Sequence, residues 1–419
     1  MKAGTAQPGA GFARALLLLL LLYFALAGLL RPLLRPYVYS DFVTFYSAAE
    51  AFAERRSPYA LDSLRRADTA FEGWVGRYFY PPPFAAVIMR PFLLLPFDLA
   101  RRLWVLVEAA AYLSAAVVLG KLAFGTLRLP HWAALGLLFL PFAPFHLDLK
   151  LGSVSGVLLL LLTLFLRAYQ RGHAWRAAGA LAAAILLKVA PAFLLAYLFL
   201  RGERRLVGRT LTMLAAYVVA TLPWSGTTAY TEYVTRVIPY LATANFSWFT
   251  NQSIDAVFWR LFMPNPDTTP WVESALLYRL GTLLLGAAIV VALVRVARRR
   301  KGMQRDAWGL GLALVASLLL ARVTWEYMVV LTLPSFVLWL RAAWNGEVKQ
   351  PLLWGAGIAY ALCALPFPYA SDPLRSGVGL LLEAPRFCGM LLAFGVGCGS
   401  QNVSGASGCG APRQSSEPI

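Results

Sequence analysis

The chain has 419 residues, of which 59% are hydrophobic and only 14% charged, and its mean hydropathy is +0.63. Soluble chains are usually about 45–50% apolar and about 25% charged. This composition excludes a soluble enzyme, a disordered protein and a small disulfide-stapled module. Because the apolar surface exceeds what one aqueous core can bury, we expect a polytopic membrane protein with lipid as the main solvent.

The net charge of +18 is distributed as the positive-inside rule predicts for cytoplasmic loops. Basic residues fall in short runs between apolar stretches, not on one face with interleaved aromatics, so we expect no nucleic-acid partner. The cysteines form no CxxC pair and the three histidines are widely spaced, so no metal site is predicted, and metal dependence stays open. The basic runs are Arg167, Arg171 and Arg176; Arg201, Arg204, Arg205 and Arg209; and Arg295, Arg298, Arg299, Arg300, Lys301 and Arg305.

The apolar run at residues 15–30 follows Lys2 and Arg14 and predicts the first transmembrane helix, with the N-terminus in the cytoplasm. A secretory signal is the alternative, but the run is long and no small-residue cleavage site follows it. Residues 35–83 then form a first polar loop, which charge bias places outside the membrane.

Many later apolar stretches are shorter than the roughly 20 residues of a full crossing, which predicts broken helices around a site. Lys188 and Pro191 interrupt residues 177–200, which predicts two short helices there. The topology of 84–120 stays ambiguous, so we predict an all-α protein with about 12 spans, between about 11 and 13. The stretches are 84–96, 99–120, 131–145, 152–166, 177–200, 207–223, 275–294, 307–321, 324–340, 352–367 and 377–396.

Two polar segments, 35–83 and 224–274, are predicted to be extracytoplasmic loops of one transmembrane domain over residues 1–397. The first segment holds six of the 20 acidic residues of the chain. Residues 398–419 are rich in glycine and serine, so we predict a disordered C-terminal tail.

An amphipathic pattern opens the first outer segment, at residues 41–54. Apolar residues at positions 42, 45, 46, 49, 52 and 53 form one helical stripe, which predicts a short helix at the membrane interface. Asp41 stands at the start of this helix. It is either a plain N-cap, which aspartate favours, or a catalytic carboxylate, and the two roles are compatible.

Ionisable residues inside apolar stretches are costly in lipid and are therefore candidates for function. Lys188 is a lone cation in such a stretch, where either a lipid phosphate or a structural ion pair would satisfy it. Arg322 and Glu326 interrupt two apolar stretches near the outer membrane edge. A further polar group, for which an ordinary juxtamembrane loop fits equally well, consists of His146, Asp148 and Lys150.

Amides and aromatic rings in the second outer segment are typical of sugar-facing surfaces, although a packed loop is the alternative. Tyr80 precedes a run of prolines, where an interfacial aromatic belt explains it as well. The residues of the second segment are Asn251, Gln252 and Arg260, with Trp248, Phe249, Phe258 and Trp259 around them.

Taken in order, these segments resemble the bacterial glycosyltransferase family 87 of GT-C fold. That family includes polyprenol-phosphate-mannose-dependent α-(1→2)-mannosyltransferases and related arabinofuranosyltransferases. No single segment is specific; the ordered set, from about residue 15 to 345, carries the resemblance. The matching residues are Asp41-Phe42, Tyr46-Ser47-Ala48-Ala49, Ser57-Pro58-Tyr59, Tyr80-Pro81-Pro82, Pro91, Leu95-Pro96, Leu103-Trp104, Leu187-Lys188-Val189-Ala190-Pro191, Asn251-Gln252-Ser253, Arg260, Trp325 and Tyr327.

Three positions depart from the pattern of that family. Residues 152–155 read Gly-Ser-Val-Ser where the family usually has Gly-Gln-x-Asn. Residues 55–57 read Arg-Arg-Ser where the family often has a glycine before the Pro-Tyr pair, and Glu326 stands where a histidine is common. These departures concern the identity of the sugar and the acceptor, and none affects Asp41.

The resemblance implies a membrane glycosyltransferase that moves mannose or a pentose-like sugar from a polyprenyl-phosphate donor to an envelope glycan or glycolipid, with inversion. It makes Asp41 the general base, because a carboxylate within about 3 Å of a hydroxyl can take its proton as the new bond forms. No cofactor is expected, and the site would lie on the extracytoplasmic face of the bacterial cytoplasmic membrane. The implied phosphate-binding residues are Lys188, Arg260 and Arg322, and the implied substrate-binding residues are Tyr46, Tyr80, Asn251, Gln252, Trp325, Glu326 and Tyr327.

Two other function classes fit parts of the sequence. A lipid or glycolipid transporter also uses broken helices and intramembrane charges, but the paired inverted halves of many transporters are not evident. A non-catalytic membrane scaffold would leave Asp41 and Lys188 unexplained. No Walker motif, catalytic triad or HExxH motif occurs, so nucleotide hydrolysis is not expected.

Overall fold

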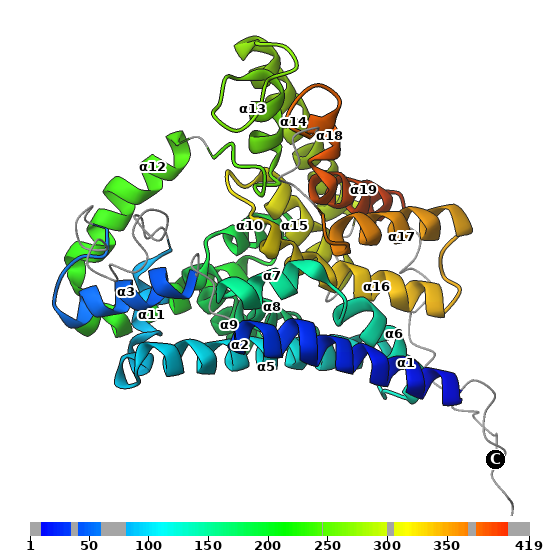
Figure 1. The fold of residues 1–419 in the computed structure, drawn as a ribbon, viewed down its shortest axis with the longest axis horizontal. Helices are drawn as coiled ribbons and strands as arrows, with labels where there is room; N and C mark the ends of the chain where they lie inside the picture. Colours follow the sequence, from blue (N-terminus) through cyan, green and yellow to red (C-terminus); the bar gives the residue numbers. More distant parts are fainter. Residues whose placement is uncertain are drawn as a thin grey trace, which may run out of the picture.

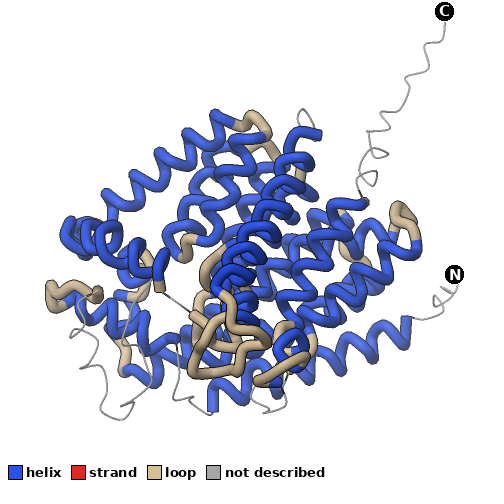
Figure 2. The backbone as a smooth tube through the Cα atoms, turned by 90° about the horizontal axis from the view of Figure 1, so that it is seen from above, coloured by secondary structure: helices blue, strands red, loops and turns tan. Residues whose placement is uncertain are grey.

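The protein is a bundle of helices joined by short loops (Figure 2). The computed structural model describes residues 10–34, 41–59, 81–244, 246–299, 306–367 and 374–400. Within these ranges the extended pairing consists of a single antiparallel bridge between Asn251 and Trp325. The predicted all-α fold is confirmed.

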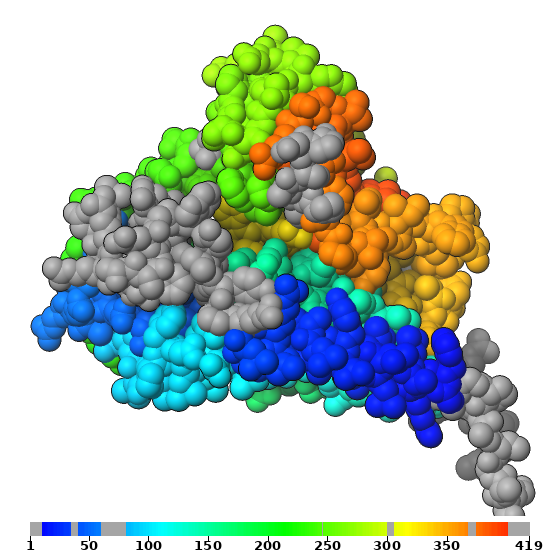
Figure 3. All heavy atoms as spheres, in the orientation of Figure 1, coloured from blue at the N-terminus to red at the C-terminus, as the bar shows by residue number. Residues whose placement is uncertain are grey.

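The N-terminal helices form one edge of the molecule, with α1 running along it beside α2 and α5 (Figure 1). The side chains of α1 are largely exposed, as for Phe12 (75%) and Leu18 (67%), and they form a ridge in the space-filling view (Figure 3). An apolar ridge of this kind suits contact with lipid. The elements are α1 (Ala10–Tyr23), the π-helix η1 (Phe24–Leu30), α2 (Arg31–Leu34), α3 (Asp41–Ala53), α4 (Pro83–Val87), the 3-10 helix η3 (Arg90–Leu94) and α5 (Phe97–Phe124).

The central elements are short and repeatedly broken, as the prolines and charges of this region predict. Pro144 lies in the first turn of α7, which is bent by 63° from α6. The expected break at Lys188 is confirmed, because α9 ends at the preceding residue and Lys188 itself is extended. The elements are α6 (Leu129–Phe139), α7 (Ala143–Leu151), α8 (Ser155–Gln170), α9 (Ala174–Leu187), the 3-10 helix η4 (Ala190–Ala192), α10 (Phe193–Leu200), α11 (Arg204–Glu232), the π-helix η5 (Tyr233–Val237) and α12 (Ile238–Thr243).

The predicted second outer loop is largely helical. α11 continues through a kink at Gly226, whose φ of 68° is in the left-handed region that glycine tolerates. α13 and one end of α14 project from the body of the molecule (Figures 1 and 3). The remaining elements are α13 (Ile254–Phe262), α14 (Ala275–Arg299), α15 (Ala307–Leu320), the 3-10 helix η6 (Glu326–Thr332), α16 (Leu333–Trp344), α17 (Gln350–Ala364), α18 (Gly379–Leu382) and α19 (Pro385–Gly399).

Five helices of the described part are long and apolar enough to cross a membrane, or six when the bent pair of α6 and α7 counts as one span. They support the membrane class, whereas the predicted number of about 12 spans stays a prediction. Several other apolar helices have 10–17 residues. The five long segments are 11–34, 97–124, 204–243, 275–299 and 326–344.

The helix predicted at residues 41–54 is present as α3, and its place at the membrane interface stays a prediction. Its apolar stripe faces inward, with Phe42 and Phe52 fully or almost fully buried, and α3 packs against α4, η3 and α11. At the centre of the molecule α8 packs against α5 and α9, and η6 packs against α7, α8 and α15. The helix ends that meet at this centre carry the polar residues described next.

Candidate active site

Asp41 is held at the first turn of α3 by the packing of its neighbour. The ring of Phe42 is fully buried, with its centroid 5.7 Å from that of Phe97 and 6.5 Å from that of Trp104. The Trp104 indole in turn donates hydrogen bonds to the carbonyl oxygens of Gly152 (3.1 Å) and Ser153 (2.7 Å). This aromatic packing fixes the start of α3 relative to the turn between α7 and α8.

Tyr327 and Lys188 lie beside Asp41. The Tyr327 side chain, at the start of η6, lies close enough to the side chains of Asp41 and Ser153 to interact with both. Lys188 Nζ lies 4.6 Å from the centroid of the Tyr327 ring, in cation–π contact. The same Nζ is buried, has no hydrogen-bond partner among the described residues, and interacts electrostatically with Asp41.

Glu108 and Asp148 form a second acidic group near Lys188, and both are fully buried. Glu108 Oε2 accepts a hydrogen bond of 2.6 Å from the Gly156 amide, at the first turn of α8. Asp148 Oδ1 accepts one of 3.3 Å from the Ser155 amide. The two carboxyl groups therefore occupy the positive end of the α8 dipole, where negative charge is stabilised.

Gly156 allows the close approach of α5 to α8. A Cβ atom at this position would lie 2.6 Å from both the backbone oxygen and Oε2 of Glu108. We expect Gly156→Ala to destabilise the protein by about 1–3 kcal/mol, because backbone and carboxylate must both move. Thermal unfolding of the purified protein measures this loss.

Gly208 in α11 is the matched control, since a Cβ atom there meets nothing within 4 Å. Gly208→Ala is expected to leave the melting temperature unchanged or to raise it. Equal melting temperatures for the two variants would contradict the packing role of Gly156.

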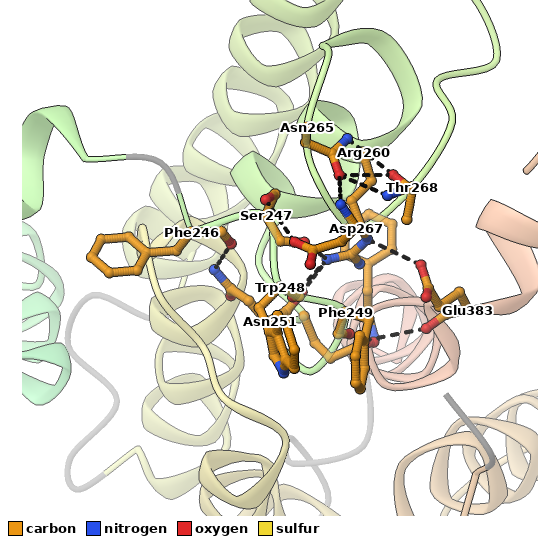
Figure 4. A network of polar contacts seen from close by, with 12 residues as sticks. Phe246, Ser247, Trp248, Phe249, Asn251, Arg260, Asn265, Asp267, Thr268 and Glu383 are labelled. Carbon is orange, nitrogen blue, oxygen red and sulfur yellow. Dashed lines mark hydrogen bonds and ion pairs between the residues drawn. The ribbon is translucent and has the colours of Figure 1, made fainter. Parts of the chain in front are cut away.

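Arg260 is buried at the centre of a separate polar network (Figure 4). Its Nη1 donates to the carbonyl oxygens of Ser247 (3.1 Å), Trp248 (3.1 Å) and Asn251 (3.0 Å), and its Nε lies 3.4 Å from Glu383 Oε2. Burial raises the pKa of the Glu383 carboxyl, and the Arg260 guanidinium opposes that shift. These contacts support a structural role, holding the 246–252 segment to the start of α19.

Asn251 and Gln252 use their amides within the same network. Asn251 Nδ2 donates to the carbonyl oxygens of Phe246 (2.9 Å) and Arg322 (3.1 Å), and its Oδ1 accepts from the Thr324 amide (2.8 Å). Gln252 Oε1 accepts from a backbone amide of α19 at 3.1 Å. Both side chains are completely buried, so in this arrangement they join chain segments.

Arg322 and Glu326, the two charges flanking Trp325, each have an ionic partner. Arg322 Nη1 lies 2.9 Å from Asp255 Oδ1. Glu326 Oε1 lies 2.6 Å from Nη2 of the fully buried Arg386. Trp325 is half-buried in the bridge with Asn251. The glutamate at position 326 therefore has a structural partner in this chain.

Tyr46 and Tyr80 are the two remaining residues that were predicted to bind the substrate. Tyr46 is buried, with its hydroxyl donating to the Leu95 carbonyl oxygen at 3.4 Å and its ring packed on Phe97. Tyr80 lies outside the described residues. Within the described residues no group of three or more His, Cys, Asp or Glu side chains is placed to hold a metal ion.

The structure thus brings together Asp41, Lys188 and Tyr327, which the sequence had singled out. It adds Glu108, which sequence reasoning missed although it is the single acid in the apolar stretch 99–120. An acid in that position is itself a signal, because ionisable groups within a span are costly. Glu383 and Arg386 carried the same signal within the apolar stretch 377–396 and were missed as well, whereas Asp255 lies in the polar segment 224–274.

Comparison with known proteins gives the family of this chain. The sequence profile of glycosyltransferase family 87 matches residues 78–323, more than half of the chain. The chain belongs to glycosyltransferase family 87. The matched region includes Lys188 and Arg260, whereas Asp41 and Tyr327 lie outside it.

An α-(1→3)-arabinofuranosyltransferase from Corynebacterium glutamicum is similar to this family 87 chain, with 27% identity over 265 residues. The similarity covers 63% of this chain and 58% of that relative. No solved structure matches the chain.

Proposed function

We propose that this family 87 protein transfers a sugar from a polyprenyl-phosphate donor to an envelope glycan or glycolipid, at the extracytoplasmic face of the bacterial cytoplasmic membrane. The observation that carries the proposal is the convergence of Asp41, Lys188 and Tyr327 at three helix ends. A carboxylate and a buried ammonium without a hydrogen-bond partner lie together, as transfer from a lipid phosphate to a hydroxyl requires.

In the proposed reaction Asp41 takes the proton of the acceptor hydroxyl as that oxygen attacks the anomeric carbon. The bond from this carbon to the phosphate oxygen breaks, and the polyprenyl phosphate leaves with the electron pair. Lys188 stabilises the negative charge that develops on the leaving phosphate. Attack opposite the leaving group inverts the anomeric configuration, so a β-linked donor yields an α-linked product.

The phosphate-binding role falls to Lys188 rather than to Arg260 and Arg322, which the family resemblance also implies. Arg260 donates to three carbonyl oxygens and pairs with Glu383, and Arg322 pairs with Asp255. A cation that already pairs with an acid of the protein has less free charge for binding a phosphate. The name of the relative favours a pentofuranose over mannose as the transferred sugar.

The test is transfer by the purified protein in nanodiscs, with polyprenyl-phosphate arabinofuranose and polyprenyl-phosphate mannose offered separately with an envelope glycolipid extract. We expect a mass increase of one pentose on the acceptor with the first donor, and an α-linkage in the product. Mass spectrometry of envelope glycans from cells with and without the gene then identifies the natural acceptor. Movement of glycolipid across vesicles without any transfer would contradict the proposal.

A further inference from the structure

The buried Glu108–Asp148 pair has no role in the proposed transfer, yet it lies next to Lys188. Glu108 comes from the middle of α5 and Asp148 from α7, and neither side chain is exposed. Their carboxyl groups lie side by side, because they accept hydrogen bonds from the consecutive amides of Ser155 and Gly156. Two carboxyl groups buried next to each other need an explanation, because each charge is costly in a low dielectric.

The closeness of the two groups favours a shared proton, because two adjacent carboxylates buried in a low dielectric repel each other. An ionised carboxylate only accepts hydrogen bonds, so two carboxyl groups can bond to each other only if one of them is protonated. Asp148 Oδ2 is buried and has no hydrogen-bond partner among the described residues. A protonated Glu108 carboxyl, beside it at the start of α8, can supply a donor.

The charges around Lys188 indicate which group stays ionised. Asp41, Asp148 and, less strongly, Glu108 interact electrostatically with Lys188. An ammonium favours the ionised form of the nearer acid. With the proton on Glu108, Lys188 interacts with two carboxylates, Asp41 and Asp148, and its Nζ is hydrogen-bonded to neither.

We propose that Glu108 and Asp148 are a proton-sharing pair, in which Glu108 carries the proton and the Asp148 carboxylate positions the Lys188 ammonium for an anionic phosphate. The proposal rests on the proposed function only for the nature of the ligand. Without Asp148 the Lys188 ammonium would pair with the Asp41 carboxylate. The cation would then be unavailable to a phosphate, and the base would be unavailable to a hydroxyl. Asp148 is therefore a positioning residue that acts through Lys188.

The first test compares variants by their Kd for undecaprenyl phosphate in nanodiscs. We expect Asp148→Asn to weaken binding at least tenfold. Glu108→Ala is expected to weaken it comparably, and Glu108→Gln is expected to restore it to within about threefold of the unmodified protein, since an amide can still donate to Asp148. Asp306, a buried aspartate 3.1 Å from Arg201, supplies the matched control, and Asp306→Asn should leave Kd unchanged within twofold.

A double-mutant cycle separates positioning from general destabilisation. In a Lys188→Met background, Asp148→Asn should change Kd by less than about twofold. The same tenfold loss in both backgrounds would overturn the proposal, as would equal losses in Glu108→Gln and Asp148→Asn. If Asp148→Asn does not fold, rescue of Glu108→Ala by Glu108→Gln decides the question.

A second measurement needs no lipid. It distinguishes failure of the proton-sharing pair from failure of the proposed sugar transfer. Reductive methylation modifies the neutral amine, and the Asp148 carboxylate favours the ammonium form of Lys188. Asp148→Asn should speed methylation of Lys188 at least threefold relative to the exposed Lys121, and Glu108→Gln should not. If the unmodified protein binds no undecaprenyl phosphate, the phosphate function fails, while the methylation pattern still supports or overturns the pair.

Discussion

Asp41→Asn is expected to lower kcat for sugar transfer by about a hundred- to ten-thousandfold, the usual contribution of a general base. The substitution separates the two roles that the sequence left open. Asparagine caps a helix as well as aspartate does, so a purely structural cap predicts little change in stability or rate. An amide cannot take the proton of an acceptor hydroxyl, so the catalytic role predicts loss of transfer from a folded protein.

The measurement is transfer of labelled sugar from a lipid-linked donor, together with thermal unfolding of the same preparation. Glu50 offers a matched control on α3, where burial and the neighbouring Glu54 raise the pKa of its carboxyl. Glu50→Gln should keep kcat within about threefold. Full turnover by the Asp41→Asn protein would show that Asp41 is not the base.

Arg260→Met is expected to destabilise the protein by about 3–5 kcal/mol, because it leaves the buried Glu383 carboxylate without its ionic partner. Three carbonyl oxygens of the 246–252 segment also lose the hydrogen bond from the guanidinium (Figure 4). For a chain of this length the apparent melting temperature should fall by about 3–5 °C. Thermal unfolding in nanodiscs measures the effect.

Two further variants distinguish structure from phosphate binding. Arg260→Met combined with Glu383→Leu should recover much of the stability, since a buried ion pair and a packed apolar pair are often similar in energy. Lys188→Met should retain the fold and lose affinity for undecaprenyl phosphate, because Lys188 Nζ has no hydrogen-bond partner to lose. If Arg260→Met kept its melting temperature and lost that affinity, Arg260 would be a phosphate ligand after all.

Sequence reasoning predicted well the features that depend on local chemistry. The helix of Asp41 follows from the apolar stripe of residues 41–53, and the break after Leu187 follows from a charge and a proline within an apolar stretch. Both are properties of short segments, and α3 and the end of α9 bear them out.

The charges were predicted less well, because a buried charge is defined by a partner that can lie anywhere in the chain. Arg386 and Glu326 are 60 residues apart, and nothing near either residue indicates the other. In the sequence Arg260 and Arg322 are cations near aromatic residues, and Lys188 is a lone cation in an apolar stretch, so nothing nearby shows whether each has a partner. In the structure the two arginines contact acids, whereas Lys188 Nζ lies near acids without a hydrogen bond to one.

By itself, then, the sequence determined the membrane class, the all-α fold and the family resemblance, since composition, hydropathy and ordered segments are contained in the chain. Tertiary structure decided which cation is available to a ligand and that Glu108 and Asp148 share one buried position at the start of α8. The physical reason is that desolvation forces each buried charge to find a partner, and only the packing of distant helices determines which partner it finds.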